Sequence, residues 1–104
     1  MNIAITMCAW RRPDNLEKVL DSIIAGGGNA NTIHLSIDGG WPAEQQEMVE
    51  CVNQKFADHY LKPIVVVHHE NIGAPTNLHQ VLERAFDDPS IDAVIHLEDD
   101  TVVH

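Results

Sequence analysis

The chain has 104 residues, with 16 Asp and Glu against 6 Lys and Arg and a net charge of −10. This balance argues against nucleic acid as a partner, because neutralising phosphates requires a basic surface. The length fits one domain or part of a larger one. Two cysteines, Cys8 and Cys51, are too few for a disulfide framework, and their apolar surroundings predict reduced core residues.

No signal peptide precedes the first predicted strand, which starts within three residues of Met1. No apolar run approaches the ~20 residues that are needed to span a bilayer. We therefore expect a cytoplasmic protein with no membrane segment in this chain.

Strand and helix patterns alternate from one end of the chain to the other. Short apolar runs predict strands over residues 3–8, 32–37, 63–68 and 93–97. Apolar residues at helical spacing predict three intervening helices. Their inward faces would be Leu16, Val19, Leu20, Ile23 and Ile24; then Met48, Cys51, Val52 and Phe56; then Leu78, Val81, Leu82, Ala85 and Phe86.

Residues with known positional preferences mark the helix ends. Asp14 is expected to cap the first helix, and the run of three glycines at 26–28 is expected to end it. Pro42 and Pro75 are expected to open the second and third helices. This β-α-β-α-β-α-β order predicts parallel strands with right-handed crossovers and a sheet covered on both faces.

Ligands of such sheets bind at the carboxyl ends of the strands, and the acidic triplet Glu98-Asp99-Asp100 follows the last predicted strand. Three adjacent carboxylates repel one another, so a cation would offset the cost of gathering them. Hard oxygen ligands suit Mg²⁺ or Mn²⁺, which commonly bridge to substrate phosphates. The alternative is a solvated acidic turn.

The other strand ends carry three further candidates. Asp38 could bind a base or ribose, or could be a turn aspartate beside Gly39. Arg11 and Arg12 could face a diphosphate, or could be a solvated pair. Trp10 could stack on a base or sugar, or cap the core. The histidines show no zinc spacing, so we interpret them as structural or surface residues.

Four motifs occur in order along the chain: Thr6–Pro13 followed by Leu20–Ile23, Ser36–Gly40, Asn71–Ala74 followed by Asn77, and Leu97–Asp100. Together they resemble family 2 glycosyltransferases of the GT-A type. There, a first strand leads through an aromatic residue and Arg-Pro into a helix. An Asp-Gly turn, an Asn-x-Gly loop and a DxD motif then follow. The Glu-Asp-Asp form is also similar to N-acetylglucosaminyltransferases of this fold.

This resemblance implies a Rossmann-like parallel sheet of order 3-2-1-4 with helices on both faces. Residues 1–104 would form the N-terminal, nucleotide-sugar-binding part of a GT-A domain, without the acceptor-binding part and the catalytic base. Thr76 stands where many relatives have Arg, and Glu98 replaces the more usual Asp. The implied nucleotide-sugar-binding residues are Ala9, Trp10, Arg12, Asp38, Asn77, Glu98 and Asp99, and the implied metal ligand is Asp100.

We therefore expect an enzyme domain that binds a nucleotide diphosphate sugar, with a UDP-sugar favoured, through Mn²⁺ or Mg²⁺. This chain alone would transfer no sugar, and its open sheet edge would favour self-association. The alternative function is a non-catalytic α/β module that binds a divalent ion or a protein partner at its acidic carboxyl edge. A phosphoacceptor receiver domain is disfavoured, because the first strand ends in Trp-Arg-Arg instead of paired acids.

Overall fold

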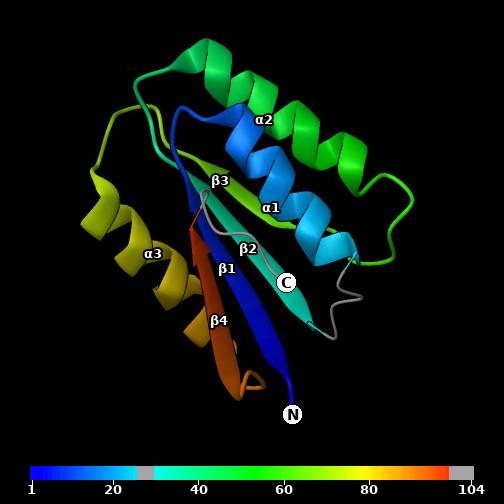
Figure 1. Cartoon of the computed structure of the whole chain (residues 1–104). Coiled ribbons are helices and arrows are strands. Elements are labelled where there is room, and N and C mark those ends of the chain that lie inside the picture. Colours follow the sequence, from blue (N-terminus) through cyan, green and yellow to red (C-terminus); the bar gives the residue numbers. More distant parts are fainter. Residues whose placement is uncertain (26–29, 99–104) are drawn as a thin grey trace.

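The computed structural model describes residues 1–25 and 30–98 of the chain (Figure 1). Strands and helices alternate along the sequence, as the apolar patterns predict. The elements are β1 (Ile3–Ala9), α1 (Pro13–Ala25), β2 (Thr32–Ile37), α2 (Pro42–Lys55), β3 (Ile64–Val67), α3 (Ala74–Phe86) and β4 (Ala93–Glu98). None of the helices in these residues is both long and apolar enough to cross a membrane.

The four strands form one parallel sheet in the order β3-β2-β1-β4. The α/β class, the parallel pairing and the predicted strand order are therefore confirmed. Helices α1 and α2 cover one face of the sheet and α3 covers the other (Figure 1). Because all strands run the same way, their carboxyl ends and the loops that follow them meet at one edge.

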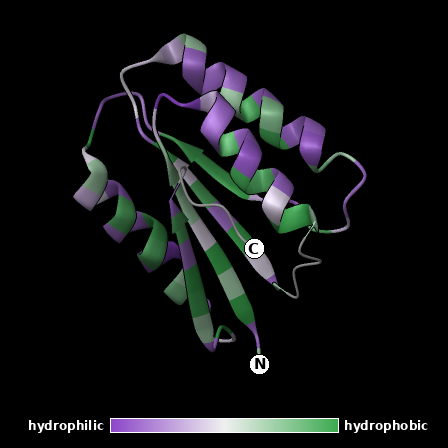
Figure 2. Cartoon of the chain, viewed as in Figure 1, coloured by the Kyte–Doolittle hydropathy of each residue, from purple (hydrophilic) through white to green (hydrophobic). Residues whose placement is uncertain are grey.

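The face beneath α1 and α2 is an apolar core. Alternate residues of β1 and β2 point toward these helices, as the period-two geometry of strands requires. Helix α1 adds its i, i+3, i+4, i+7 stripe of Leu16, Val19, Leu20 and Ile23. Figure 2 shows hydrophobic residues along much of the sheet and alternating hydrophilic and hydrophobic residues along these two helices. The buried residues of this core include Ile5, Met7, Ala9, Ile33, Leu35, Ile37, Met48, Val52 and Phe56.

The face beneath α3 is polar by comparison. Thr6, His34 and Ser36 are buried there among a few small apolar residues. The buried stripe of α3 is Asn77, Val81 and Ala85, at i, i+4 and i+8. The prediction that Phe86 faces inward is wrong, because its side chain is 59 % exposed, and Leu78 and Leu82 are only half-buried. Two hydrogen bonds between Asn77 and Ser36 of β2, one in each direction, fix the rotation of the helix, and Phe86 then points outward.

Helix boundaries differ slightly from the sequence predictions. Helix α1 begins at Pro13, so Asp14 lies in its first turn and is not the N-cap. The carbonyl of Arg12 accepts the first helical hydrogen bond from Leu16, and proline at the first position needs no such partner. Pro42 does open α2. The glycines at 26–28 lie outside the described residues.

Neither of the two cysteines forms a disulfide. Cys8 is buried, as predicted, whereas Cys51 is only half-buried between α1 and α2. Burial raises the pKa of the Cys51 thiol, and the neighbouring Glu17 carboxylate raises it further.

Candidate functional site

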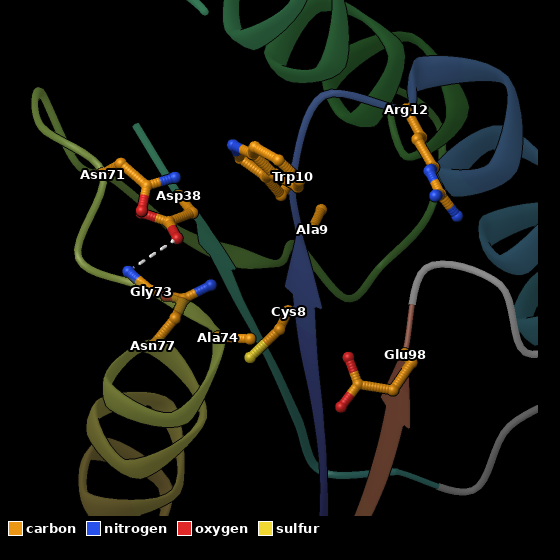
Figure 3. A pocket seen from close by; sticks show the side chains of 10 residues that line it. All are labelled: Cys8, Ala9, Trp10, Arg12, Asp38, Asn71, Gly73, Ala74, Asn77 and Glu98. Carbon is orange, nitrogen blue, oxygen red and sulfur yellow. Dashed lines mark hydrogen bonds between the residues drawn. The ribbon is translucent and has the colours of Figure 1, made fainter. Parts of the chain in front are cut away.

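A cavity of about 390 Å³ opens at the carboxyl edge of the sheet. Its walls come from the ends of β1, β2 and β4, from the loops after β1 and β3, and from the first turn of α3 (Figure 3). These segments are far apart in the sequence and meet because the strands are parallel. The lining residues are Cys8, Ala9, Trp10, Arg12, Asp38, Asn71, Gly73, Ala74, Asn77 and Glu98.

The motif resemblance implies seven nucleotide-sugar-binding residues and one metal ligand. Six of these eight residues lie in the lining: Ala9, Trp10, Arg12, Asp38, Asn77 and Glu98. The other two, Asp99 and Asp100, lie outside the described residues. Cys8 was interpreted only as a core residue, although its place one residue before the strand end could have identified it. That the six residues bind a nucleotide sugar remains a prediction.

The Asp38 side chain is only 3 % exposed, and its carboxylate accepts hydrogen bonds from backbone N–H groups. Its Oδ1 accepts hydrogen bonds from the backbone N–H groups of Gly39 and Ile72, each at 2.8 Å, and its Oδ2 accepts one from Gly73 at 3.1 Å. The last of these is drawn in Figure 3. The carboxylate thus ties the loop after β3 to the end of β2, and that loop forms one wall of the cavity.

Gly39 explains why the Asp-Gly pair occurs at this turn. A Cβ atom built on Gly39 would lie 2.4 Å from the carbonyl oxygen of Glu70 and 2.6 Å from that of His68. Both neighbours are backbone atoms, so any larger residue would force the two loops apart. Gln45 of α2 reinforces the contact by donating to the carbonyl oxygens of Asp38 and His68.

Asn77 joins the first turn of α3 to the centre of the sheet. Its Oδ1 accepts a hydrogen bond from the Ser36 hydroxyl, and its Nδ2 donates to the Ser36 carbonyl at 3.1 Å. Both ends of the amide are therefore used within the protein. Like Asp38, Asn77 shapes the cavity through structural hydrogen bonds.

Glu98 stands at the end of a chain of hydrogen bonds that starts inside the sheet. Thr6 Oγ1 lies 2.8 Å from His96 Nδ1, and His96 Nε2 lies 2.9 Å from Glu98 Oε1. A hydroxyl, an imidazole and a carboxylate in this order also occur in nucleophilic hydrolases. Thr6 is fully buried, however, so no substrate can reach its oxygen. These hydrogen bonds instead orient the Glu98 carboxylate.

The sequence patterns alone indicate no role at the site for Thr6 and His96. The signal that could have found them is the register of the sheet, in which Thr6 of β1 is paired with His96 of β4. Cys8 is paired with Glu98 in the same ladder, so the residues lie on one face of the sheet.

Positive charge reaches the cavity from two sources. Arg12 lines it directly, and no carboxylate within the described residues forms an ion pair with its guanidinium. Helix α3 begins at the cavity with Gly73 as its N-cap and with no side-chain cap, so the positive end of its dipole faces the same space. The positive charge of these groups partly offsets the negative charge of the Asp38 and Glu98 carboxylates.

The structure tests the predicted metal site only in part. In residues 1–25 and 30–98, no group of three or more His, Cys, Asp or Glu residues is arranged to hold a metal ion. Glu98 supplies one half-exposed carboxylate beside the cavity, and the predicted ligand Asp100 lies outside these residues. Binding of Mn²⁺ or Mg²⁺ therefore stays a prediction.

Comparison with known proteins does not assign a family. A scan against models of protein families finds no match, and a search among curated proteins finds no relative. A function for this chain must therefore be inferred from its own residues.

Proposed function

We propose that this chain is the donor-binding part of a glycosyltransferase and binds a nucleotide diphosphate sugar in the cavity at the carboxyl edge. One observation carries the proposal: six residues marked by the motif resemblance come from four separate segments and line a single cavity of about 390 Å³. A volume of this size falls within the range of small-molecule sites. The carboxyl edge of a parallel sheet is also where nucleotides bind in related architectures.

The lining offers a matching group for each part of such a ligand. The Trp10 ring, 40 % exposed, provides an aromatic surface for a base. Arg12 and the uncapped start of α3 would face the diphosphate. Such local positive groups are needed because the whole chain carries a net charge of −10. The Glu98 carboxylate would accept hydrogen bonds from ribose or sugar hydroxyls.

Asp38 and Asn77 take a different role in this proposal from the one that the resemblance implies. Their polar side-chain atoms already bond to Ile72, Gly73 and Ser36. We therefore assign them to the walls that give the cavity its shape. The ligand would contact the backbone that they hold in place.

A divalent cation remains part of the proposal, with Asp100 as its ligand. When bound, it would act as a Lewis acid on the departing diphosphate. Asp100→Ala should weaken the binding of a UDP-sugar measured by titration calorimetry in Mn²⁺ and leave binding without metal unchanged. Equal affinities of mutant and parent in Mn²⁺ would remove Asp100 from the site.

The proposal as a whole is tested with UDP, the part that all UDP-sugars share. The parent chain should bind UDP more tightly with Mn²⁺ than without it. Arg12→Ala should weaken UDP binding by about tenfold, the typical value of one charge-assisted contact to phosphate. Lys18→Ala is the matched control, because it removes the same charge from the exposed surface of α1.

Two results would contradict the proposal. The first is a parent chain that binds no nucleotide diphosphate at all. The second is an Arg12→Ala variant that binds UDP as tightly as Lys18→Ala does. Mn²⁺ binding without any nucleotide binding would instead favour the non-catalytic α/β module that binds a divalent ion at its acidic edge.

A further inference from the structure

The loop between β1 and α1 contains a backbone conformation that few side chains adopt. Arg11 has a φ of 62°, and it is the only residue other than glycine with a positive φ in the described part of the chain. This left-handed conformation brings Cβ close to the following carbonyl group and costs free energy for an arginine. Such a conformation persists because the surrounding structure offsets its cost, and contacts of the side chain are one contribution.

The Arg11 guanidinium makes its contacts with two tryptophan rings. Its Cζ atom lies 4.1 Å from the centroid of the Trp41 ring and 5.9 Å from that of Trp10. Both distances are within the ~6 Å over which a cation is attracted to an aromatic face. No carboxylate in the described residues pairs with Arg11, so these rings are its charge partners.

The three side chains connect two loops at the carboxyl edge. Trp10 and Arg11 belong to the loop after β1, and Trp41 is the N-cap residue of α2, at the end of the loop after β2. Of the three, only Trp10 lines the cavity. Trp10 thus connects the cavity to Arg11, which in turn contacts Trp41.

The two adjacent arginines thus have different surroundings. Arg12 lines the cavity, whereas Arg11 lies over the aromatic rings and is absent from the lining. We infer that Arg11 is a positioning residue, which holds the Trp10 ring against the cavity by linking it to Trp41, so that the ring can stack on a nucleobase. This inference rests on the proposed function, because it requires a nucleoside in the cavity.

The inference predicts which part of the ligand responds to each arginine. Loss of Arg11 should weaken the binding of uridine and of UDP by the same factor, because both ligands carry the base that stacks on Trp10. Loss of Arg12 should weaken the binding of UDP only. We expect Arg11→Gly to weaken both ligands by about fivefold, the effect of losing one exposed cation–π contact.

Glycine is the informative replacement because it adopts a positive φ without strain. Arg11→Gly therefore relieves the backbone while removing the side chain, and its thermal stability should equal or exceed that of the parent. Arg11→Lys keeps the charge but lacks the planar guanidinium that stacks on rings. Its affinity for uridine should lie between those of the parent and Arg11→Gly.

A second measurement needs no ligand. The chain has two tryptophans, so in a Trp41→Phe background the fluorescence reports Trp10 alone. Arg11→Gly in that background should increase the quenching of Trp10 by acrylamide, because the ring loses its contact with the Arg11 guanidinium. An unchanged quenching constant would overturn the inference, whatever the chain binds.

The titrations themselves follow the indole N–H resonance of Trp10 with uridine and with UDP. Equal weakening of the two ligands in Arg11→Gly supports the positioning role. A weaker affinity for UDP with an unchanged affinity for uridine would make Arg11 a phosphate contact and overturn the inference. Unchanged affinity for both would also overturn it. A parent that binds neither ligand contradicts the proposed function itself, and the quenching experiment then still decides the role of Arg11.

Discussion

The two faces of the sheet are built from different chemistry, although the same strands supply both. Toward α1 and α2, β1 presents Ile5, Met7 and Ala9, and β2 presents Ile33, Leu35 and Ile37. Toward α3, the intervening positions include Thr6, Cys8, His34 and Ser36. The first face buries apolar surface, while the second holds its helix through directed hydrogen bonds.

Because of this difference, one face mainly stabilises the fold and the other mainly fixes the position of α3. Apolar burial is the main favourable contribution to folding and has little directionality. Hydrogen bonds between buried groups require a single geometry, so they fix the place of α3 relative to β2. The start of α3 forms one wall of the cavity. The polar face therefore determines the shape of the site, and the apolar face keeps the sheet folded.

The largest expected effect is on the apolar face. Phe56→Ala should lower the free energy of unfolding by about 3–5 kcal/mol, because Phe56 is only 1 % exposed and its loss leaves a cavity in the core. Phe86→Ala makes the same chemical change on the exposed side of α3 and should cost less than about 0.5 kcal/mol. Urea unfolding measures both, and similar values would contradict the assignment of the two faces.

Asp38→Asn should destabilise the chain by about 2 kcal/mol, as expected when a charged acceptor of several backbone N–H groups is replaced by a neutral one. Asp58→Asn removes the same charge at an exposed position and should change the stability little. Urea unfolding again provides the measurement. If Asp38→Asn keeps the parent's stability but loses affinity for UDP, Asp38 is a ligand contact, as the motif resemblance implies.

The Ser36–Asn77 pair tests whether the polar face acts through specific hydrogen bonds. A double-mutant cycle of Ser36→Ala and Asn77→Ala should give a coupling energy of about 1 kcal/mol. The same cycle of Thr76→Ala with Ser36→Ala should give a coupling energy near zero, because the Thr76 side chain is exposed. Additive effects in the Ser36–Asn77 cycle would mean that the amide does not hold α3.

The sequence predicts the elements of this fold because they depend on repeating signals, such as the helical spacing from Leu16 to Ile23. The β-α-β order predicts parallel strands, whereas the strand order, which the structure confirms, was implied only by the motif resemblance. The carboxyl-edge position of Trp10, Arg12 and Glu98 follows from the same topology. For such residues, knowing which strand they follow is enough to place them near the cavity.

The partners of individual polar groups could not be predicted in this way. The resemblance implies ligand contacts for Asp38 and Asn77, and Asp38 could also be a turn aspartate; the structure shows that their side-chain atoms bond to the backbone of the next loop and to Ser36. These contacts depend on which neighbours the fold brings within hydrogen-bond distance. The rotation of α3 was mispredicted for the same reason, since an asparagine instead of a large apolar residue determines its inward face.

The smallest expected effect concerns His34, a buried imidazole on the polar face. Its Nδ1 atom has no hydrogen-bond partner in the described residues. Thr6 is its neighbour across the sheet, and His96 lies beyond Thr6 on β4. Burial lowers the pKa of His34 below its ordinary value of 6.5, the Arg84 guanidinium of α3 lowers it further, and the Asp88 carboxylate opposes this shift.

Because the folded chain disfavours the charged form, the unfolded chain binds more protons at His34 once the pH falls below about 6.5. The contribution of neutral His34 to stability is complete above that pH and declines as the pH falls toward the lowered value. Urea unfolding between pH 7.5 and 5.5 should therefore show a shallower loss of stability in His34→Gln than in the parent. His79→Gln removes an exposed imidazole on α3. It should therefore keep the dependence of the unfolding free energy on pH that His34 causes in the parent. Equal slopes in His34→Gln and His79→Gln would mean that the polar face accommodates a charged imidazole at little cost, against the direction in which burial shifts the pKa of His34.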